Sequence, residues 1–268
     1  MFASRPDGAE IAWESTGSGP AVLLIMGLAY PGASWFRQVP ALAERYRVLT
    51  IDNRGSGDTG DAVGAPYTVE LMTGDCLAVL DAAGEERAHV VGISMGSLMA
   101  QELALTAPER VLSLTLMAAH PGVSNAVWPE EVTAFMGARL GMSPEESREF
   151  SIPFNYAPTT ARELIEEDWA LRAKGTATPV GYAAQGGTAL WSGLDRLPGL
   201  RVPTLVVQGE LDRLVVPANA DLLVNAIPGA QLTVVPGANH VLTTDQPELV
   251  NRVLLDWFDA HPSSQPAS

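Results

Sequence analysis

The stretch that decides the fold is Val90-Val91-Gly92-Ile93-Ser94-Met95-Gly96-Ser97-Leu98-Met99-Ala100-Gln101. It begins with a β-branched run, passes through Gly-x-Ser-x-Gly and continues as a run of good helix formers, an order that predicts a strand, a sharp turn and a helix. A serine at such a turn has a strained backbone, and its hydroxyl stands clear of the sheet edge. Gly92 and Gly96 are expected where a Cβ would clash with nearby backbone. Because the following helix points its unpaired N–H groups at whatever lies over Ser94, this serine is the first candidate functional residue.

Length and composition indicate a globular protein with a large core. The 268 residues are 47% hydrophobic and 18% charged. There are 31 acidic and 16 basic residues, which gives a formal net charge of −15. Affinity for phosphate backbones comes from clustered Lys and Arg, and anionic membranes repel a negative protein. We therefore expect neither nucleic acid nor a membrane as a partner.

The single cysteine and the amino terminus bear on the compartment. Cys76 lies in the helix-like run Leu71–Ala83, where a small buried apolar side chain is a plainer interpretation than a reactive thiol. One cysteine cannot form a disulfide within the chain, which suits the cytosol. Residues Met1–Pro6 lack the apolar core of a signal peptide, and no run approaches the roughly 18 apolar residues that cross a membrane. We expect a cytoplasmic protein, and the sequence leaves its oligomeric state open, a homodimer included.

Strand and helix patterns alternate in two parts of the chain, residues 1–120 and 198–268. The alternation predicts an α/β fold with a largely parallel sheet, formed by one core domain from these two parts. The predicted strands are Ile11–Thr16, Ala21–Met26, Arg47–Asp52, Ala88–Ile93, Val111–Met117, Thr204–Gln208 and Gln231–Val235. The predicted helices are Trp35–Tyr46, Thr68–Ala83, Met95–Thr106, Asp221–Ile227 and Pro247–His261.

The alternation stops between residues 121 and 197, where no strong strand pattern occurs. Helical patterns at Glu130–Leu140, Thr160–Lys174 and Val180–Leu194 are separated by prolines. We interpret residues 121–197 as a helical cap, or lid, inserted into the core domain. Most of its aromatic side chains and methionines are expected to pack between helices, and a minority to line a substrate pocket. The candidates for the pocket are Trp128, Phe135, Tyr156 and Trp191.

Four predicted loops meet at one edge of the sheet, because ligands bind beyond the carboxyl ends of parallel strands. These loops hold Gly27-Leu28, Ser94, Asp212 and His240. A serine hydroxyl becomes a nucleophile when a neighbouring base takes its proton, and histidine suits that task because it titrates near neutral pH. A buried carboxylate on the far ring nitrogen fixes the tautomer and stabilises the imidazolium. The residues therefore predict a catalytic triad of Ser94, His240 and Asp212.

Three segments of the chain resemble the motifs of the α/β-hydrolase superfamily. They are Gly92-Ile93-Ser94-Met95-Gly96 for the nucleophile, Gly209-Glu210-Leu211-Asp212 for the acid and Gly237-Ala238-Asn239-His240 for the histidine. The order Ser, Asp, His along the chain is the order of that superfamily. The resemblance covers the chain from Gly8 to Phe258. It implies an α/β-hydrolase fold, with a mostly parallel sheet flanked by helices and a helical lid inserted after the sixth strand.

Shorter segments resemble two groups within the superfamily. Val39-Pro40-Ala41-Leu42-Ala43-Glu44-Arg45-Tyr46 and Gly181-Tyr182-Ala183-Ala184 are similar to 3-oxoadipate enol-lactonases. Ile25-Met26-Gly27 and Ala88-His89-Val90-Val91-Gly92 are similar to polyketide methylesterases of the aclacinomycin type. These resemblances imply an ester or lactone as substrate.

The superfamily resemblance also implies an oxyanion hole built from two main-chain N–H groups. One follows the nucleophile and the other lies in the loop after an early strand, which on this sequence are those of Met95 and Leu28. Many members have His just before the loop glycine, whereas this chain has Met26. That departure changes how the loop is braced and removes neither donor.

Each assignment has a plainer alternative. Ser94 could be an ordinary turn serine, and Asp212 a loop or helix-capping carboxylate. Among the other histidines, His89 begins a strand at the wrong end of the sheet and His261 lies in the terminal tail. His120 lies at the right end and could reach the pocket, but a solvated or core histidine is the plainer interpretation.

Three charged residues near these loops receive structural interpretations. Asp52 and Arg54 are interpreted as a pair, and Asp245 as a charge at a helix amino terminus. The histidines are scattered and Cys76 has no partner, so no metal-ligand spacing is present. The chain also lacks a phosphate-cradling loop and a dinucleotide fingerprint. We therefore expect neither a metal nor a cofactor.

These residues predict a serine hydrolase that cleaves a carboxylic ester or lactone of a hydrophobic small molecule through an acyl-enzyme on Ser94. Dehalogenases and epoxide hydrolases of this fold have Asp at the nucleophile position and are set aside. One alternative is a cofactor-free perhydrolase of the non-haem haloperoxidase type, which uses the same triad with peroxide as acyl acceptor. The other is a ligand-binding or auxiliary biosynthetic protein that keeps the fold with an idle triad.

Overall fold

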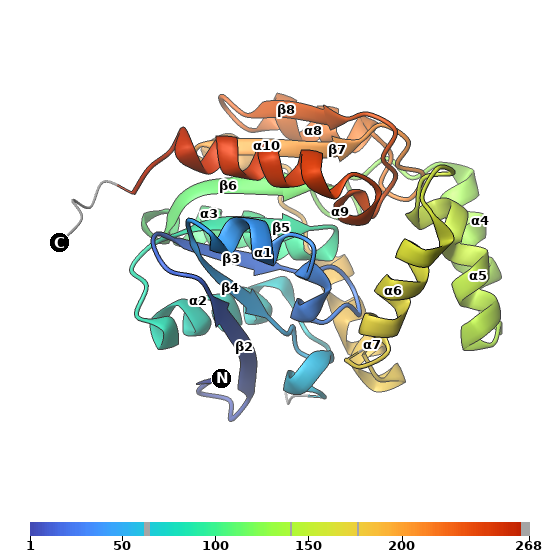
Figure 1. The fold of residues 1–268 in the computed structure, drawn as a ribbon, viewed down its shortest axis with the longest axis horizontal. Coiled ribbons are helices and arrows are strands. Elements are labelled where there is room, and N and C mark those ends of the chain that lie inside the picture. Colours follow the sequence, from blue (N-terminus) through green and yellow to red (C-terminus); the bar gives the residue numbers. More distant parts are fainter. Residues whose placement is uncertain (62–64, 140, 176, 264–268) are drawn as a thin grey trace.

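The computed structural model describes residues 1–61, 65–139, 141–175 and 177–263, so the end of the predicted tail lies outside the described residues. Its strands form one eight-stranded sheet in the order β1-β2-β4-β3-β5-β6-β7-β8 (Figure 1). Strand β2 is antiparallel to β1 and β4, and every other neighbouring pair is parallel. The strands are β1 (Phe2–Ser4), β2 (Glu10–Thr16), β3 (Ala21–Ile25), β4 (Arg47–Ile51), β5 (Ala88–Ile93), β6 (Val111–Met117), β7 (Thr204–Gly209) and β8 (Gln231–Val235).

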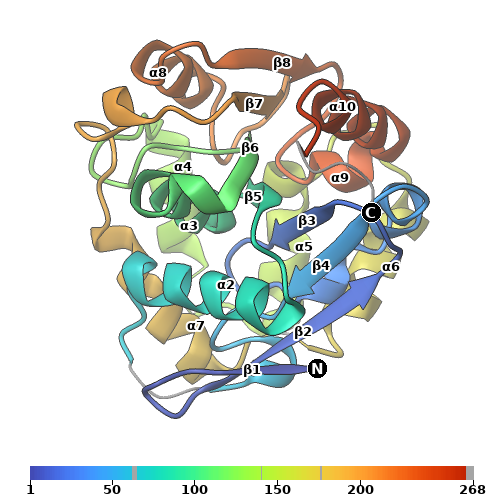
Figure 2. The same cartoon turned by 90° about the vertical axis from the view of Figure 1, so that its left-hand side faces the viewer.

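Helices cover both faces of this sheet (Figure 2). They are α1 (Val39–Ala43), α2 (Val69–Ala83), α3 (Met95–Thr106), α4 (Glu130–Ala138), α5 (Pro144–Asn155), α6 (Arg162–Arg172), α7 (Pro179–Gln185), α8 (Ala218–Ala226), α9 (Leu242–Asp245) and α10 (Pro247–Asp259). Short 3-10 helices are η1 (Gly32–Trp35), η2 (Gly57–Thr59), η3 (Pro108–Arg110), η4 (Gly186–Leu190) and η5 (Leu197–Gly199).

The sheet has a hydrophobic core on each face because its central strands are apolar throughout. Every residue of β3, β5 and β6 is buried, as expected for parallel strands covered on both sides. Successive side chains of a strand point to opposite faces, so Leu23 packs with Val79 of α2 and Leu103 of α3. Its neighbour Leu24 enters the other core with Phe258 of α10.

Some elements differ from the sequence prediction for reasons of short-range chemistry. The predicted helix Trp35–Tyr46 is divided into η1 and α1. Pro40 lies near the start of α1, where its missing N–H costs nothing, whereas inside a longer helix its ring would clash with the preceding turn. The three-residue strand β1 was not predicted, because so short a run gives no periodic pattern.

Helix α5 was also not predicted, because its two prolines were taken as breaks. Ser143 accepts a hydrogen bond from the N–H of Glu146 (3.2 Å), and the Glu146 carboxylate accepts one from the N–H of Ser143 (2.8 Å). This capping box starts the helix, and a proline at its first position is favourable. Pro153 lies close to the end of the helix. The spacing of Ser143 and Glu146 was the sequence signal for this element.

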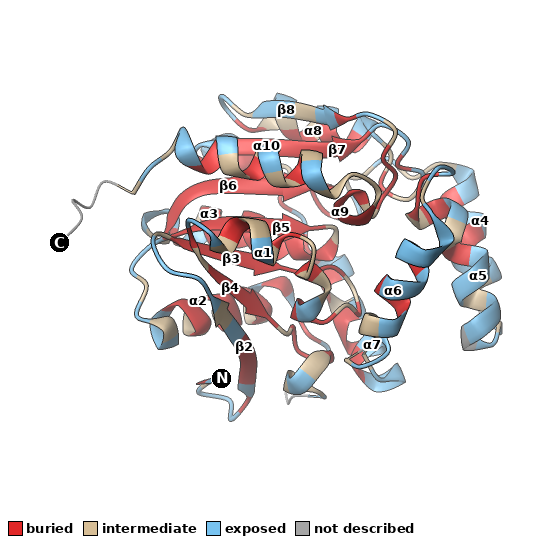
Figure 3. Cartoon of the chain, viewed as in Figure 1, coloured by how far each residue is buried: buried red, intermediate tan, exposed pale blue. Residues whose placement is uncertain are grey.

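Helices α4 to α7 all lie between β6 and β7, within residues 121–197, which we call the inserted segment. They gather beyond one end of the sheet (Figure 1), and their outer surfaces are exposed while the central strands are buried (Figure 3). No helix in the described ranges is long and apolar enough to cross a bilayer.

Candidate active site

Ser94 lies at the turn between β5 and α3 in a strained backbone conformation. Its φ is 53° and its ψ is −121°, a region that side-chain-bearing residues occupy only when the surroundings enforce it. Its N–H donates to the carbonyl of Met117 (2.9 Å). Its carbonyl accepts from the N–H (2.9 Å) and the hydroxyl (2.6 Å) of Ser97. These bonds hold the turn and leave the Ser94 hydroxyl free to face the cavity.

Glycines let three backbone segments approach one another around this turn. A Cβ on Gly96 would lie 2.2 Å from the carbonyl oxygen of Ile25, and one on Gly92 would lie 2.4 Å from the carbonyl oxygen of Gly96. Gly27, in the loop after β3, packs against Ser94, and a Cβ there would be 3.3 Å from the Ser94 Cβ. The close approach places the loop after β3 directly beside the serine.

The structure brings Ser94, His240 and Asp212 together, as the sequence predicts. The His240 Nε2 atom lies 3.1 Å from the Ser94 Oγ, and its Nδ1 atom lies 3.0 Å from the Asp212 Oδ2. Asp212 follows β7 and His240 follows β8, while Ser94 follows β5. His240 is 7% exposed and Asp212 is 2% exposed. The three side chains therefore form a continuous hydrogen-bonded chain from a buried carboxylate to the cavity.

The Asp212 carboxylate is held in place on both oxygens. Its Oδ1 accepts hydrogen bonds from the N–H groups of Leu214 (2.9 Å) and Val215 (2.8 Å). Its Oδ2 accepts from the Gln208 side chain (3.2 Å) in addition to facing His240. Donors of this kind satisfy a carboxylate that lies away from water. They also fix which oxygen faces the imidazole.

Asn239, which the sequence analysis did not single out, holds the loop that carries His240. Its side-chain oxygen accepts from the N–H groups of Arg213 (3.0 Å) and His240 (2.9 Å). Its side-chain nitrogen donates to the carbonyls of Tyr156 (2.9 Å) and Pro153 (3.1 Å). The amide thus joins the acid loop, the histidine loop and the inserted segment. Its position beside His240 in the histidine motif was the available signal.

The sequence interpretation of Asp245 as a charge at a helix amino terminus accounts for only part of its contacts, since Asp245 lies in the one-turn helix α9 directly before the N-cap of α10. Asp245 is the last residue of α9. Its carboxylate accepts hydrogen bonds from the N–H of Asn239 (2.7 Å) and the N–H of Ala157 (3.1 Å), and also from the hydroxyl of Thr160. Burial raises the pKa of this carboxyl above its usual value. Asp245 therefore fastens the inserted segment to the histidine loop.

The interpretation of Asp52 and Arg54 as a pair with each other is also corrected. Arg54 is fully buried and pairs with Asp75 (2.6 Å) and Asp7 (2.7 Å). Asp52 instead accepts hydrogen bonds from the N–H groups of Gly32 (2.6 Å) and Asp58 (2.8 Å). Both residues are structural, through partners far apart in the sequence.

The loop after β3 carries Leu28 and its N–H, and Leu28 lines the same cavity as Ser94. This N–H donates to no acceptor among the described residues, and that of Met95 is at the first position of α3, where a helix offers no acceptor. The Asn53 side chain donates to the carbonyl of Met26 (2.9 Å), and Gln185 accepts from the N–H of Ala29 (2.8 Å). Asn53 and Gln185 thus brace the loop in which Met26 replaces the histidine of many relatives.

A cavity of about 570 Å³ opens over these residues. It lies between the inserted segment and the loops after β3, β5, β7 and β8, which we call the strand-end loops. Two of the four side chains predicted for a pocket, Trp128 and Phe135, line it. Tyr156 is buried and packs instead with Ile165 and Trp169. Trp191 lies in the main core, where its indole N–H donates to the buried carboxylate of Glu102 (2.9 Å). The sequence pattern did not distinguish the aromatic residues that line the cavity from those that pack in the interior.

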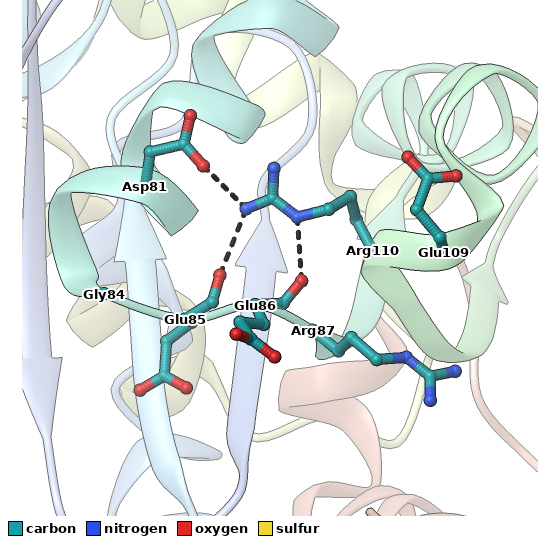
Figure 4. A pocket seen from close by; sticks show the side chains of 7 residues that line it. All are labelled: Asp81, Gly84, Glu85, Glu86, Arg87, Glu109 and Arg110. Carbon is teal, nitrogen blue, oxygen red and sulfur yellow. Dashed lines mark hydrogen bonds and ion pairs between the residues drawn. The ribbon is translucent and has the colours of Figure 1, made fainter.

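A second, open hollow lies at the opposite end of the sheet (Figure 4). Its charged contacts are structural, since Arg110 donates to Asp81 (2.7 Å) and to the carbonyls of Glu85 (3.1 Å) and Glu86 (2.7 Å), and Arg47 pairs with the Glu85 carboxylate (2.7 Å). The bonds of Arg110 join the end of α2 to η3. Within the described ranges no group of His, Cys, Asp and Glu could hold a metal ion. Cys76 is fully buried, and burial raises the pKa of its thiol above the usual range.

The model of the α/β hydrolase fold family matches residues 20–247. The chain belongs to this family. The prediction of an α/β-hydrolase fold with a mostly parallel sheet flanked by helices is thereby confirmed.

Relatives that match most of this chain are named as hydrolases or peroxidases. The chain is 32% identical to RutD of Azorhizobium caulinodans, a proposed carbamate hydrolase, over 93% of this chain and 95% of the relative. It is 30% identical to BpoC of Mycobacterium tuberculosis, a proposed non-haem bromoperoxidase, over 92% and 97%. It is similar in structure to a thermophilic esterase from Thermogutta terrifontis, with a TM-score of 0.84 and 27% identity over 98% and 99% of the two chains.

Proposed function

We propose that this protein is a serine hydrolase that cleaves a carboxylic ester or lactone of a hydrophobic small molecule. The observation that carries the proposal is the hydrogen-bonded chain from Asp212 through His240 to Ser94 at the floor of the cavity. A buried carboxylate, an imidazole and a serine in this geometry form the standard arrangement for acyl transfer.

The reaction begins when the Ser94 Oγ attacks the substrate carbonyl carbon and His240 takes the hydroxyl proton. Asp212 faces the far nitrogen of the ring and stabilises the imidazolium. The N–H groups of Leu28 and Met95 donate to the oxyanion of the tetrahedral intermediate, where removal of one such donor typically costs about 3–4 kcal/mol. His240 then gives the proton to the departing alkoxide, which leaves an acyl-enzyme on Ser94. Water, deprotonated by His240, releases the acid and restores the serine.

The lining of the cavity supports a hydrophobic substrate. Leu98, Val132, Phe135 and Met136 contribute apolar side chains to its wall. The structural likeness to an esterase and the resemblance to enol-lactonases and methylesterases favour an ester or lactone bond. An apolar wall and few polar groups are typical of sites that take small organic ligands.

Hydrolysis of p-nitrophenyl esters, from acetate to octanoate, tests the proposal. Ser94→Ala is expected to lower kcat by roughly 10⁴–10⁶, because the nucleophile is lost while the cavity remains. Ser34→Ala is the matched control, since it removes a second serine hydroxyl from the cavity wall without touching the triad. It is expected to retain activity within about threefold. A Ser94→Ala protein that hydrolyses these esters at the wild-type rate would disprove the assignment.

The likeness to BpoC favours one alternative, a cofactor-free perhydrolase. In that reaction peroxide replaces water as the acceptor of the acyl group on Ser94, and the resulting peracid oxidises bromide. Bromination of monochlorodimedone in acetate, peroxide and bromide would support this alternative if it depends on Ser94. A wild-type protein that hydrolyses esters but shows no acetate-dependent bromination would exclude the perhydrolase alternative and support the hydrolase proposal.

A further inference from the structure

His120 is a buried histidine in the cavity wall that the proposed triad does not use. It lies just after β6, the strand next to the one that carries Ser94. Its side chain is 6% exposed, and it lines the same cavity as Ser94 and His240. The plainer interpretation from the sequence was a solvated or core histidine; the residue is buried and also lines the cavity.

The ring and its backbone are held by three contacts. The N–H of Gly122 donates to the His120 Nδ1 atom (3.2 Å). The His120 carbonyl accepts a hydrogen bond from the side chain of Gln101 (3.1 Å), which is itself fully buried. The carbonyl of Pro121 accepts from the N–H of Gly193 (3.0 Å). The position of the ring is therefore fixed before any substrate enters.

These contacts determine where the ring carries its proton. A backbone N–H can only donate, so Nδ1 is the unprotonated acceptor and a neutral His120 carries its proton on Nε2. Burial, with a smaller contribution from His240, lowers the pKa of His120 to about 4. None of the described residues accepts a hydrogen bond from Nε2. A rigid and uncharged donor thus borders the cavity without a protein partner.

We infer that His120 is a substrate-binding residue whose Nε2–H donates a hydrogen bond to an uncharged oxygen of the substrate, outside the reacting ester. A keto, ether or hydroxyl oxygen fits this donor. The ring of Trp128 lies edge-on to His120 with centroids 5.2 Å apart, so the donor is bordered by an aromatic surface. The inference rests on the proposed function and narrows its substrate class to hydrophobic esters or lactones that bear a further oxygen acceptor.

Two other roles fit His120 less well. As a second general base it would need a pKa closer to neutral, and burial moves its pKa in the opposite direction. A second imidazolium would also be unfavourable beside His240, which becomes positively charged during acyl transfer. As a purely structural side chain it would leave its Nε2–H, on a residue that lines the cavity, without an acceptor among the described residues.

The kinetic test uses two pairs of esters that differ by one acceptor oxygen. The acyl side is probed with p-nitrophenyl 4-oxopentanoate and p-nitrophenyl pentanoate. The alcohol side is probed with 2-methoxyethyl butanoate and butyl butanoate, whose hydrolysis is followed by acid release. We expect the wild type to prefer the oxygen-bearing ester in at least one pair. Comparing the preference of wild type and variant cancels the intrinsic reactivity of each ester.

His120→Asn is the decisive variant, because its side-chain oxygen can still accept from the N–H of Gly122 while the shorter side chain withdraws the donor from the cavity. We expect the preference to fall by roughly 5- to 20-fold, mainly through KM, because the hydrogen bond is present before and during the reaction. His120→Gln, whose amide can donate, is expected to retain part of the preference. The inference is overturned if the wild type shows no preference in either pair, or if the preference survives in His120→Asn.

A binding measurement separates this inference from the proposed function. Methyl 4-oxopentanoate and methyl pentanoate are titrated into the Ser94→Ala protein and into Ser94→Ala/His120→Asn, where no turnover is needed. Tighter binding of the keto ester that disappears with His120→Asn supports the donor even if no ester is hydrolysed by the wild type. Equal binding of the keto ester to the two proteins, together with the same result for 2-methoxyethyl and butyl butanoate, contradicts it even if hydrolysis depends on Ser94.

Discussion

The two sides of the cavity are built by different means. On one side, the loops after β3, β5, β7 and β8 are fixed by main-chain hydrogen bonds, and the side chains of Asp212 and His240 are almost fully buried. On the other side, the inserted segment supplies apolar side chains, of which Met136 remains 45% exposed and Tyr182 38% exposed. Reaction geometry needs positions held within fractions of an ångström, whereas substrate selection tolerates change. We therefore expect chemistry to depend on the strand-end loops, and selectivity on the inserted segment together with His120 after β6.

Glycines show the same contrast. At the turn that carries Ser94, Gly92 of β5 and Gly96 of α3 have backbone atoms where a Cβ would lie. In α4 of the inserted segment, Gly137 has no heavy atom within 4 Å of such a position. The turn that carries Ser94 has no room for a Cβ, whereas the surface of α4 has room for one at Gly137.

The largest effect is expected from Asp212→Asn, which alters the strand-end side alone. An amide in place of the carboxylate stabilises the imidazolium poorly and can hold His240 in the wrong tautomer, so kcat should fall by roughly 10³–10⁴. Ester hydrolysis by purified protein measures this. Asp221→Asn, the same change at an exposed site on α8, is the control and should leave kcat unaltered. Equal activities of the two variants would contradict the role of Asp212.

Gly96→Ala and Gly137→Ala compare the two regions directly. At Gly96 the new Cβ would meet the carbonyl oxygens of Ile25 (2.2 Å) and Met26 (2.7 Å), so β3 or its loop must move. We expect a loss of about 3 kcal/mol or more, which is a fall in Tm of about 6–12 °C for a chain of this size. At Gly137 alanine should instead stabilise the helix by about 0.5–1 kcal/mol. Thermal unfolding measures both, and a destabilised Gly137→Ala would show that the contrast is false.

Much of the strand-end side can be predicted from the sequence, because short sequence patterns determine where its residues lie. Gly-x-Ser-x-Gly between a strand and a helix places Ser94 without knowledge of the rest of the chain. Asp212 and His240 each follow an apolar strand, and parallel strands carry both to the same edge. Fold, chain order and triad geometry thus depend on patterns a few residues long.

The inserted segment was harder to predict because packing between helices leaves no short pattern. Phe135 and Tyr156 are both aromatic residues in helical surroundings, yet one lines the cavity and the other packs with Trp169. The positions of these two side chains depend on how α4, α5 and α6 lie against the strand-end loops. Partners far apart in sequence, such as Arg54 and Asp75, are undetermined for the same reason.

Acid should destabilise the sheet in part through His89, a buried histidine of β5. The inserted segment contains no histidine. His89 is the second residue of β5 and is fully buried, and burial lowers its pKa from 6.5 to about 4. Between these values the unfolded chain binds a proton that the folded chain does not, so stability falls as the pH falls from 6.5 towards 4. The loss is at most about 3 kcal/mol.

The measurement is urea unfolding of the wild type and His89→Leu at several pH values in this range. Buried carboxyls titrate there as well, so the difference between the two proteins is the informative quantity. The free energy of unfolding of the wild type, relative to that of His89→Leu, should fall as the pH falls, because only the wild type loses the contribution of a neutral His89. A difference that stays constant from neutral to acidic pH would contradict the burial argument.

The smallest effect is expected from Trp128→Ala, which alters the inserted segment at the cavity. Trp128 is only partly buried, so Tm should change by about 2 °C or less, while KM for aromatic esters should rise about 3- to 10-fold because stacking area is lost. Trp191→Phe is the matched control. It leaves the Glu102 carboxylate without its indole donor, and should lower Tm by about 2–6 °C without changing KM. Because the sequence analysis proposes both tryptophans for the pocket, opposite results on KM and Tm would show that position relative to the strand-end loops decides which aromatic residue selects the substrate. If Trp191→Phe changed KM as much as Trp128→Ala, a residue packed in the core would affect substrate binding as strongly as one at the cavity. That result would contradict the proposed division between the two sides of the cavity.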